Sequence, residues 1–551
     1  MKSKENVKDL LIIPSATYAS EDIQESFGKI PFCLIPVSGV PIINHIIKKY
    51  SLQNFRILIV AKEGINQIES VVEKNKDVEI IEIDQLRDLG YTIQFALEYA
   101  LKFFGDISRI VINFADTLIE DLSQVLVNKD CIFYSEVYDS LRWTTFNNDN
   151  GKIKYLADKE NLEGSQFNGF IGVFTFVKPK ELLASFKIIR PSKKMDSFYG
   201  ALLEYNKKFD FIFVKIDNWR DLGHKDEYLS TKKKLQFRFF NSIQIDETRG
   251  ILTKKSNNEE KLKKEIQWYL KLPSNLLYVI PSIYNYSMEY KDVSVSMEYY
   301  GYPTLSELMV YGNLEMRSWQ KFMNKLFFIV DEFRKYQIVD LFDQKIHSID
   351  QMYLKKTTSR LYSIRDNKNF TRFFKNVIKI NGKTYPTLSK IIEDLDEYIK
   401  IMKLRDDIVF SIIHGDLCFS NILYDVNSGI IRLIDPRGSF GAFDIYGDVK
   451  YDMAKVSHSI NSGYDFIISD MFEVNDGYNE INYKIRKNNN CKILSSLFDE
   501  RIQGQELKKI RFIESLLYLS MPPLHADFPK RQKVMLANGI ELLFKTLNEN
   551  G

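Results

Sequence analysis

Cysteine is scarce in this chain, and the few cysteines do not cluster. The 551 residues include Cys33, Cys131, Cys418 and Cys491, which form neither a CxxC pair nor a Cys/His group with zinc spacing. A disulfide framework and a zinc-binding module are therefore not indicated. We expect four buried free thiols.

Long hydrophobic runs and an excess of one charge are also missing. No stretch reaches the roughly 18 apolar residues that cross a bilayer, and the few apolar residues before Pro14 are too few for a signal peptide. The 76 basic and 73 acidic residues nearly balance, and no polybasic run indicates a nucleic-acid partner. We expect a cytoplasmic protein that does not insert into a membrane and does not bind nucleic acid.

The length and the patterning predict two large domains. Before about Leu235, short apolar strands alternate with amphipathic helices, which predicts an α/β domain (1–235) with a mostly parallel, Rossmann-like sheet. After it, a small α+β lobe (236–303) and a long helical lobe (304–551) predict a second, two-lobed domain. The asparagine-rich segment around Asn489 is interpreted as a surface loop.

One apolar stretch carries three polar side chains. In "HGDLCFSNIL", Asp416 and Asn421 stand five residues apart, and the apolar strand "IIRLID" ends in Asp435 fourteen residues later. Phosphoryl transfer from ATP needs a carboxylate that orients the attacking hydroxyl and oxygen ligands for Mg²⁺. A single such residue is more often a cap of a helix or turn. Three in this order favour a phosphotransferase site, which a loop and a short hairpin would assemble.

These residues resemble a known family. "HGDLCFSNIL" followed by "LIDPRG" resembles the catalytic and metal-binding loops of the aminoglycoside phosphotransferase and choline kinase family, which has a protein-kinase-like fold, over roughly residues 237–551. The resemblance implies that Asp416 is the catalytic base and that Asn421 and Asp435 bind the metal. It also implies structural roles for three residues: His414, Asp448 and Asp452. Asp435-Pro436-Arg437 in place of Asp-Phe-Gly argues for a small-molecule acceptor.

The same resemblance implies an ATP site upstream. Lys254 would contact the phosphates and Glu265 on the next helix would fix it; we prefer Lys254 to Lys255 because its strand register points inward. Backbone groups of Glu298 and Tyr300 in "VSVSMEYYG" would bind the adenine edge, with an ordinary strand end as the alternative. No glycine-rich phosphate loop is present nearby.

The first half resembles a second family. "PFCLIPVSGVPIINH", "VINFADTLIED", "FNGFIGVFTF" and "NWRDLGHKDEY" resemble the sugar-nucleotide and CTP-dependent nucleotidyltransferases over about residues 8–231. Such enzymes join a phosphate ester to a nucleoside triphosphate and release pyrophosphate. The resemblance implies an Mg²⁺ held by Asp116 and Asp221. It also implies substrate contacts from four further residues: Gly90 to the base, Lys159 to the substrate phosphate, and Asn168 and Gly169 to the acceptor.

The first half also departs from that family. The glycine-rich loop ending in arginine is replaced by "PSATYASEDIQESFGK", the lysine expected after Pro31 is Phe32, and the usual Gly-Lys-Pro is Gly39-Val40-Pro41. Lys29 is the alternative cation for the triphosphate. Two interpretations stay open: a divergent active transferase, or a domain that binds a nucleotide or product without turnover.

Together these patterns indicate a bifunctional enzyme. We expect the second half to phosphorylate a small hydroxyl compound of the choline, polyol or sugar type with ATP and Mg²⁺, and the first half to couple the product to a nucleotide from CTP or another triphosphate. The product would be an activated donor for surface (capsule) polysaccharide. The alternatives are a small-molecule kinase with an inactive first domain and a non-catalytic nucleotide-sensing interaction protein. The sequence leaves open whether the protein is a monomer or a homo-oligomer.

Overall fold

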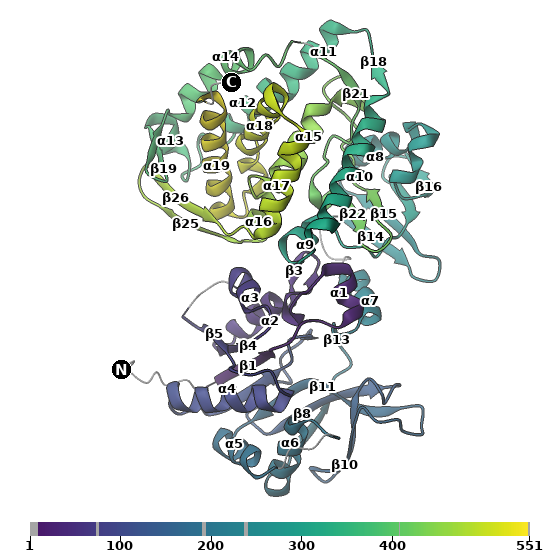
Figure 1. Ribbon diagram of the computed structural model, residues 1–551, viewed down its shortest axis with the longest axis vertical. Coiled ribbons are helices and arrows are strands. Elements are labelled where there is room, and N and C mark those ends of the chain that lie inside the picture. The colour runs from purple at the N-terminus through teal and green to yellow at the C-terminus, as the bar shows by residue number, and fades with distance from the viewer. Residues whose placement is uncertain (1–8, 73–75, 190–193, 236–240, 407, 549–551) are drawn as a thin grey trace. The chain divides into compact units, whose positions relative to one another are not determined.

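The chain forms two compact units. The computed structural model describes residues 9–72, 76–189, 194–235, 241–406 and 408–548, and the chain divides into unit 1, residues 1–235, and unit 2, residues 236–551 (Figure 1). All four cysteines are buried and free, as the sequence predicts. In the described parts of both units, no helix has the length and apolar character that a membrane crossing requires.

Unit 1 is built on a mixed nine-stranded sheet. Its strands are β1 (Asp9–Ser15), β4 (Arg56–Ala61), β5 (Val78–Glu82), β6 (Arg109–Asn113), β8 (Cys131–Val137), β9 (Thr144–Asp149), β10 (Lys152–Asp158), β11 (Phe167–Phe176) and β12 (Ile212–Lys215). Strands β6, β1, β4 and β5 lie side by side and run parallel. The central part is therefore the α/β layer that the alternation of strands and helices predicts.

The sheet is less parallel than we expected from the sequence. β11 runs antiparallel to β6, β8 and β9, and β9 forms a hairpin with β10. The hairpin turns at Asn150 and Gly151, which both have positive φ. Asn-Gly is the preferred pair for a two-residue hairpin turn, so this signal was present in the sequence.

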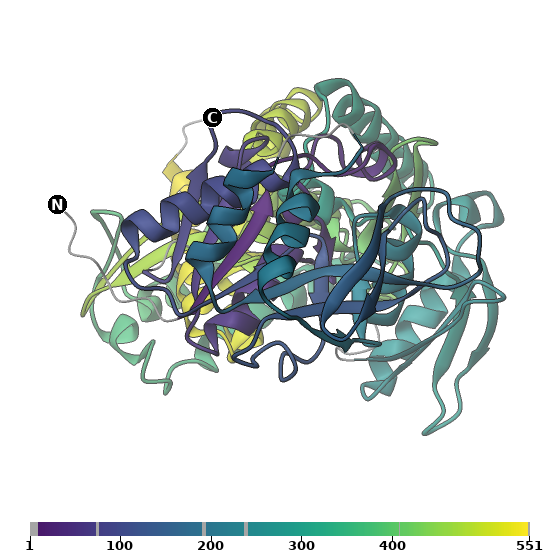
Figure 2. The same ribbon diagram turned by 90° about the horizontal axis from the view of Figure 1, so that it is seen from below.

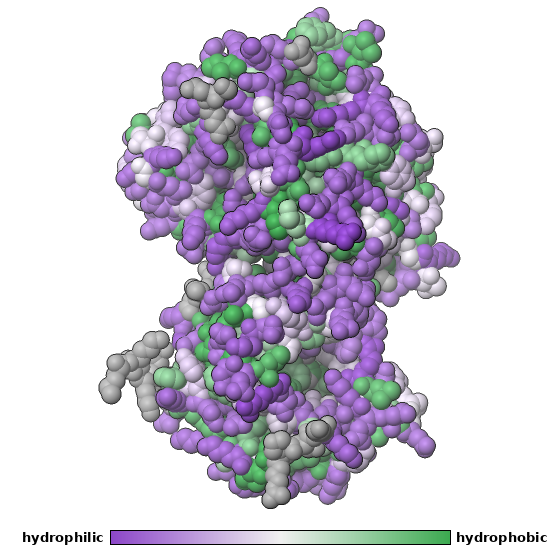
Figure 3. Space-filling view, viewed as in Figure 1, coloured by the Kyte–Doolittle hydropathy of each residue, from purple (hydrophilic) through white to green (hydrophobic). Residues whose placement is uncertain are grey.

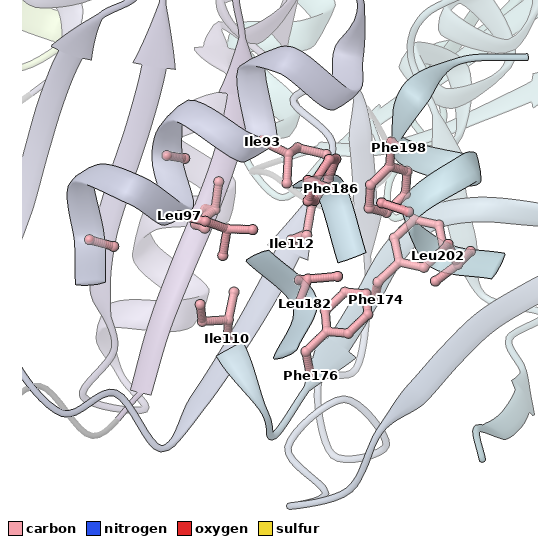
Figure 4. Packing of buried hydrophobic residues seen from close by; sticks show 14 of the residues in the cluster. Ile93, Leu97, Ile110, Ile112, Phe174, Phe176, Leu182, Phe186, Phe198 and Leu202 are labelled. Atoms are coloured by element: carbon pink, nitrogen blue, oxygen red, sulfur yellow. The ribbon is translucent and has the colours of Figure 1, made fainter. Parts of the chain in front are cut away.

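Helices bury both faces of the central strands. The helices of unit 1 are α1 (Glu21–Phe27), α2 (Ile42–Ser51), α3 (Ile65–Val71), α4 (Leu89–Phe103), α5 (Pro179–Ile188), α6 (Ser197–Lys208) and α7 (Lys225–Leu235). Of these, α4 contacts β1 and β4, and α2 contacts β4. Both ribbon views show α4, α5 and α6 together (Figure 1, Figure 2). Alternate strand residues such as Ile110 and Ile112 pack against Ile93 and Leu97 of α4 (Figure 4). On the other face, the Tyr50 hydroxyl of α2 donates to Asn113 Oδ1 at 3.2 Å.

Unit 2 begins with a small lobe. Its elements are β14 (Asn241–Asp246), β15 (Ile251–Ser256), α8 (Glu259–Lys271), β16 (Ile283–Ser287) and β17 (Ser294–Glu298). The strands form an antiparallel sheet in the order β14-β15-β17-β16. Asn258 caps α8 by accepting a hydrogen bond from the Lys261 N–H. Glu265 lies on the buried, mostly apolar face of this helix, beside Leu262 and Ile266.

The rest of unit 2 is mainly helical, as predicted, but it also contains strands. The helices are α9 (Leu305–Val310), α10 (Met316–Arg334), α11 (Phe342–Ile349), α12 (Lys356–Tyr362), α13 (Thr371–Lys375), α14 (Leu388–Ile401), α15 (Val449–Ile460), α16 (Tyr464–Ile468), α17 (Asn489–Arg501), α18 (Gly504–Leu519) and α19 (Pro529–Asn548). The strands that position the candidate site are β21 (Phe410–Ile412), β22 (Ile422–Asp425), β23 (Ile430–Leu433) and β24 (Tyr446–Asp448). On the face in Figure 3, hydrophilic side chains predominate.

The asparagine-rich segment is not a surface loop, and our interpretation of it was wrong. Asn488 caps α17, which begins at Asn489. The Asn490 amide is buried, and its nitrogen donates to the carbonyl oxygens of Met309 and Gly312 at 3.0 and 2.9 Å. Asparagine side chains favour helix N-caps, and a buried amide with satisfied partners is stable.

Candidate active sites

The loop after β21 and the β22–β23 hairpin bring Asp416, Asn421 and Asp435 to one region of unit 2. The Asn421 side-chain nitrogen donates to the carbonyl oxygen of Asp416 at 2.9 Å. The Ile434 N–H donates to the Asn421 carbonyl at 3.0 Å, directly before Asp435. The backbone of the hairpin therefore ties the three polar residues together. Asp435 has φ +56°, and its side chain is 49% exposed.

Lys254 joins the small lobe to Asp435. Its Nζ lies 2.9 Å from both carboxylate oxygens of Glu265 and 2.6 Å from Asp435 Oδ1. Burial would lower the pKa of Lys254, which is 7% exposed, but Asp435 and Glu265 outweigh burial and raise the pKa above its usual value. The lysine is therefore a fixed cation. Lys255 instead pairs with Asp292 on the surface at 2.7 Å.

His414 braces the loop from inside the core. Its side chain is fully buried, Nε2 donates to the Ile434 carbonyl at 3.0 Å, and Nδ1 accepts from the Asp416 N–H at 3.3 Å. Burial lowers the pKa of His414 to about 4, so the ring is neutral near pH 7. A neutral imidazole with one donor and one acceptor fits these two partners.

Two buried aspartates hold the segment around this loop. Asp452 accepts hydrogen bonds from the backbone N–H groups of His414 and Gly415 at 2.7 and 2.8 Å. Asp448 caps α15 at the Lys450 N–H and accepts from the Tyr353 hydroxyl at 2.9 Å. Both aspartates bond backbone or neighbouring side chains, which is the type of role that the sequence predicted for them.

We expect Asp452→Ala to lower the free energy of unfolding of unit 2 by about 2–4 kcal/mol, because two buried N–H groups lose their acceptor. Urea denaturation followed by tryptophan fluorescence measures it, since Trp268 and Trp319 of unit 2 are buried. Asp394→Asn on the surface of α14 is the matched control and should change the value by less than about 0.5 kcal/mol. A loss below about 1 kcal/mol for Asp452→Ala would contradict the bracing role.

Sequence reasoning missed Lys455. Its Nζ lies 2.8 Å from Asp416 Oδ1. Burial would raise the pKa of Asp416, but Lys455 outweighs burial and holds the pKa well below its usual range. Lys455 follows Asp452 by three residues on α15, so helical spacing was a signal that it reaches the same loop.

The expected adenine-binding residues lie at the end of the small lobe. The Glu298 N–H donates to the Ser282 carbonyl at 2.9 Å. Of the two backbone groups of Glu298, only the carbonyl oxygen is therefore left to bind adenine. The Tyr300 hydroxyl donates to Glu298 Oε2 at 2.6 Å and accepts from Arg432 Nε at 3.0 Å. The chain then reaches Thr304, which forms a bridge to Leu423 of β22.

In unit 1, Asp116 and Asp221 lie close together. Asp116 follows β6, and Asp221 ends β13 (Trp219–Asp221), which pairs with β7 (Thr117–Ile119). A Cβ atom on Gly223 would lie 2.8 Å from Asp116 Oδ2 and 3.3 Å from Asp221 Oδ1, so both carboxylates approach this glycine. Burial and the neighbouring Asp221 raise the pKa of Asp116 to about 6. His224 Nδ1 lies 2.7 Å from Asp221 Oδ2, a partner that we had not predicted.

The segment at which the sequence resemblance leads one to expect a glycine-rich loop is acidic. From Asp9 to Gly28 the chain has no lysine or arginine, and α1 carries Glu21, Asp22 and Glu25. This helix lies beside the aspartate pair, because Ser20 Oγ donates to the Gly223 carbonyl at 3.0 Å and the Lys225 N–H donates to Asp22 Oδ2 at 3.2 Å. Acidic side chains at this place repel a triphosphate.

The other predicted substrate residues of unit 1 lie on neighbouring elements. The Gly90 N–H donates to Asp196 Oδ1, and the Asp196 N–H donates to Oδ2 of Asp158, which precedes Lys159. Gly169 of β11 and Ala157 of β10 both pair with Thr145 of β9. Lys29 and Lys159 are exposed, and Gly90 packs against α6, where a Cβ would lie 2.2 Å from the Phe198 nitrogen. Asn168 lines a cavity of about 690 Å³, and Gly169 follows it on β11. The cavity is lined by Glu136, Thr145, Phe146, Asn147, Tyr155, Leu162, Glu163, Gly164, Gln166, Phe167 and Asn168. Its lining includes neither aspartate of the pair.

Within the described residues, no group of three or more His, Cys, Asp or Glu side chains is placed to hold a metal ion. Mg²⁺ in nucleotide sites is commonly held by one or two carboxylates together with substrate phosphates. Asp116 with Asp221, and Asp435 with Asn421, could each offer oxygen ligands to a metal in this way.

The sequence matches no family model and no curated protein. Among solved structures, a Bacillus anthracis protein described as a glucose-1-phosphate thymidylyltransferase in complex with a sucrose is 16% identical, with a TM-score of 0.36, covering 42% of this chain and 97% of its own. HddC from Yersinia pseudotuberculosis, also solved in complex with GMP-PN, is 18% identical, with a TM-score of 0.32, covering 41% of this chain and 99% of its own. These similarities concern the N-terminal part of the chain.

Proposed function

We propose that the chain is a bifunctional transferase. Unit 2 transfers the γ-phosphoryl group of ATP to the hydroxyl of a small molecule of the choline, polyol or sugar type, and unit 1 transfers a nucleotidyl group, CMP from CTP, to the product. The product serves as an activated donor for surface polysaccharide. The observation that carries the proposal is the contact of Lys254 with both Glu265 and Asp435, residues 11 and 181 positions away in the chain.

Each group in unit 2 has a definite task. Lys254 binds the α and β phosphates, and Glu265 keeps it in place. Asp416 accepts the hydrogen bond of the acceptor hydroxyl. The acceptor oxygen forms its bond to the γ-phosphorus while the bond to the bridging oxygen of ADP breaks. Because Lys455 keeps the pKa of Asp416 low, Asp416 orients the hydroxyl and takes its proton only as the new bond forms.

Asn421 and Asp435 fit Mg²⁺, which would neutralise phosphate charge when bound. The Asn421 side-chain nitrogen is used by the Asp416 carbonyl, so the atom left for a metal is the amide oxygen, a ligand type that Mg²⁺ prefers. The Asp435 carboxylate, which is half-exposed, supplies the anionic oxygen.

The test uses the full chain with ATP, Mg²⁺ and a panel of small alcohols, amino alcohols and sugars, followed by mass spectrometry. Each of the four nucleoside triphosphates is then added. We expect a phosphorylated acceptor and ADP, and pyrophosphate when CTP is present. Asp116→Asn should abolish pyrophosphate release and leave ADP formation unchanged. Loss of both activities together, or no Mg²⁺-dependent ATP turnover with any acceptor, would overturn the two-site proposal.

A second candidate is a kinase whose unit 1 binds a nucleotide or product without turnover. The acidic side chains of α1 favour this alternative, because an active transferase needs cations at the triphosphate. A nucleotide-sensing interaction protein differs from both in having no ATP turnover. Pyrophosphate release with CTP and the phosphorylated acceptor separates the first two candidates.

The proposed transferase site should lose its metal in acid. Asp116 has a pKa of about 6, so below pH 6 a divalent cation must displace a proton from the pair. We expect the Mg²⁺ concentration for half-maximal pyrophosphate release to rise about tenfold between pH 7 and pH 5. ADP formation in the same samples serves as the internal control. A requirement for Mg²⁺ that is independent of pH would contradict the role of Asp116.

A further inference from the structure

Basic side chains gather beside Asp416 in unit 2. Lys356 and Arg360 lie one helical turn apart on α12, and Arg437 follows Asp435 by two residues. We call these three residues the basic cluster. Lys356 Nζ and Arg437 Nη1 donate to the Tyr451 hydroxyl at 3.1 and 3.3 Å.

The basic cluster belongs to the candidate catalytic loop. The Arg437 N–H donates to the His414 carbonyl at 3.0 Å, and a Cβ atom on Gly415 would lie 2.9 Å from Arg437 Cβ. Tyr451 precedes Lys455 by one turn of α15, and Lys455 contacts Asp416. The cluster is therefore next to the oxygen that would orient the acceptor hydroxyl.

The positive charge of the cluster is not balanced by acids. Among the described residues, Lys356, Arg360 and Arg437 form no ion pair with a carboxylate, and the nearby Asp416 is already paired with Lys455. Arg360 donates to the carbonyl and hydroxyl oxygens of Ser520 at 3.2 and 3.4 Å. Cations that are partly removed from water are normally paired, because unpaired charge is costly to bury.

The excess of positive charge shifts the pKa values of Lys356 and of the neighbouring Tyr451. Burial and the neighbouring cations lower the pKa of Lys356 to about 8. Tyr451 is 1% exposed, and burial would raise the pKa of its hydroxyl, but Lys356, Arg437 and Lys455 outweigh burial and lower the pKa to about 7. The Tyr451 hydroxyl, which Lys356 and Arg437 contact, can therefore supply negative charge to the cluster.

The local backbone is also unusual. The segment Asp350–Lys355, directly before Lys356, is π-helical. π-Helical turns are rare, cost stability, and occur often at functional sites. Here α12, which carries Lys356 and Arg360, begins directly after the turn.

We propose that the acceptor of the phosphotransferase carries an anionic oxygen group, a phosphate or a carboxylate, which the basic cluster of Lys356, Arg360 and Arg437 binds while the acceptor hydroxyl meets Asp416. This inference rests on the proposed function and narrows it. A choline-type cation is repelled by the cluster, whereas a polyol or sugar that bears a phosphate or carboxylate is attracted.

The test measures binding of inorganic phosphate by calorimetry to the full chain, in the presence of Mg²⁺ and a non-hydrolysable ATP analogue that occupies the site at Lys254. Acetate in a parallel titration distinguishes a phosphate from a carboxylate site. We expect one phosphate to bind, and Lys356→Gln to weaken its binding about tenfold or more. Lys355→Gln, an exposed lysine next in sequence, is the matched control and should bind as the unmodified chain does.

The outcomes separate this inference from the proposed function. If the ATP analogue binds but neither anion does, or if Lys356→Gln and Lys355→Gln bind equally, the anionic acceptor is ruled out and the kinase proposal stands. If the analogue itself does not bind, the kinase proposal fails. Should Lys356→Gln not fold, Arg360→Gln takes its place, and the titration of the unmodified chain still decides whether the anion binds.

A matched acceptor series gives a second readout. Glycerol, glycerate and 3-amino-1,2-propanediol share one carbon skeleton and differ in charge, and ribose and ribose 5-phosphate form a second set. We expect only the anionic members to raise ADP formation or to compete with inorganic phosphate. Preference for the amine or for the neutral compound over the anion would overturn the inference.

Discussion

Asp416→Asn is expected to lower kcat for ATP-dependent phosphorylation about 10³-fold or more, while the KM for ATP changes little. Asparagine has nearly the same shape but carries no charge, so it cannot take the proton of the acceptor hydroxyl as the bond to phosphorus forms. Steady-state kinetics that follow ADP release measure both constants.

The matched control is Asp394→Asn on α14, which should leave kcat unchanged. Thermal denaturation shows whether the loss of the ion pair with Lys455 destabilises unit 2. If Asp416→Asn is folded and retains more than about a tenth of kcat, Asp416 is not the group that meets the hydroxyl.

Asp435→Asn is expected to lower kcat/KM for ATP about 10³-fold and to weaken nucleotide binding in the presence of Mg²⁺. The substitution removes the anionic ligand of the metal and the partner of Lys254 at 2.6 Å. Titration of Mg²⁺ at fixed ATP, with ADP release as the readout, measures the effect.

Asp444→Asn is the control for Asp435→Asn, because Asp444 pairs with Lys271 on the surface of the same unit. It should not change the Mg²⁺ requirement. Asp416→Asn and Asp435→Asn should also differ from each other, since we expect Asp416→Asn to leave the affinity for the metal–ATP complex intact. An Asp435→Asn protein with an unchanged Mg²⁺ requirement would contradict the metal-binding role.

The arrangement in unit 2 could be predicted where it depends on short-range spacing. Asp416 and Asn421 share one loop. The hairpin strand β22 starts directly after Asn421, and its partner β23 ends two residues before Asp435, so local pattern was enough to bring the three residues together. Lys254 was distinguishable from Lys255 because successive strand residues point to opposite faces. The chemical roles of these residues stay predictions.

The parts that escaped prediction depend on contacts between distant segments. Gly90 packs against Phe198, which lies more than a hundred residues later in the chain, and no local sequence pattern predicts this contact. Asn490 is buried because carbonyl groups of α9 and the turn after it accept from its amide, which a polar run of residues does not indicate. Lys455 and the Asn150-Gly151 turn were readable from spacing and turn chemistry, and we did not use them.

For the proposed phosphotransferase, the contact between Lys254 and Asp435 has a consequence for the order in which substrates bind. The ammonium group is a built-in counter-ion for the carboxylate, so free Mg²⁺ must compete with a tethered cation before it can settle there. A nucleotide that already chelates the metal avoids this competition, because its phosphates draw the ammonium toward themselves as the metal takes its place. If unit 2 is the proposed phosphotransferase, the chelate, rather than either component alone, is therefore the species that it binds.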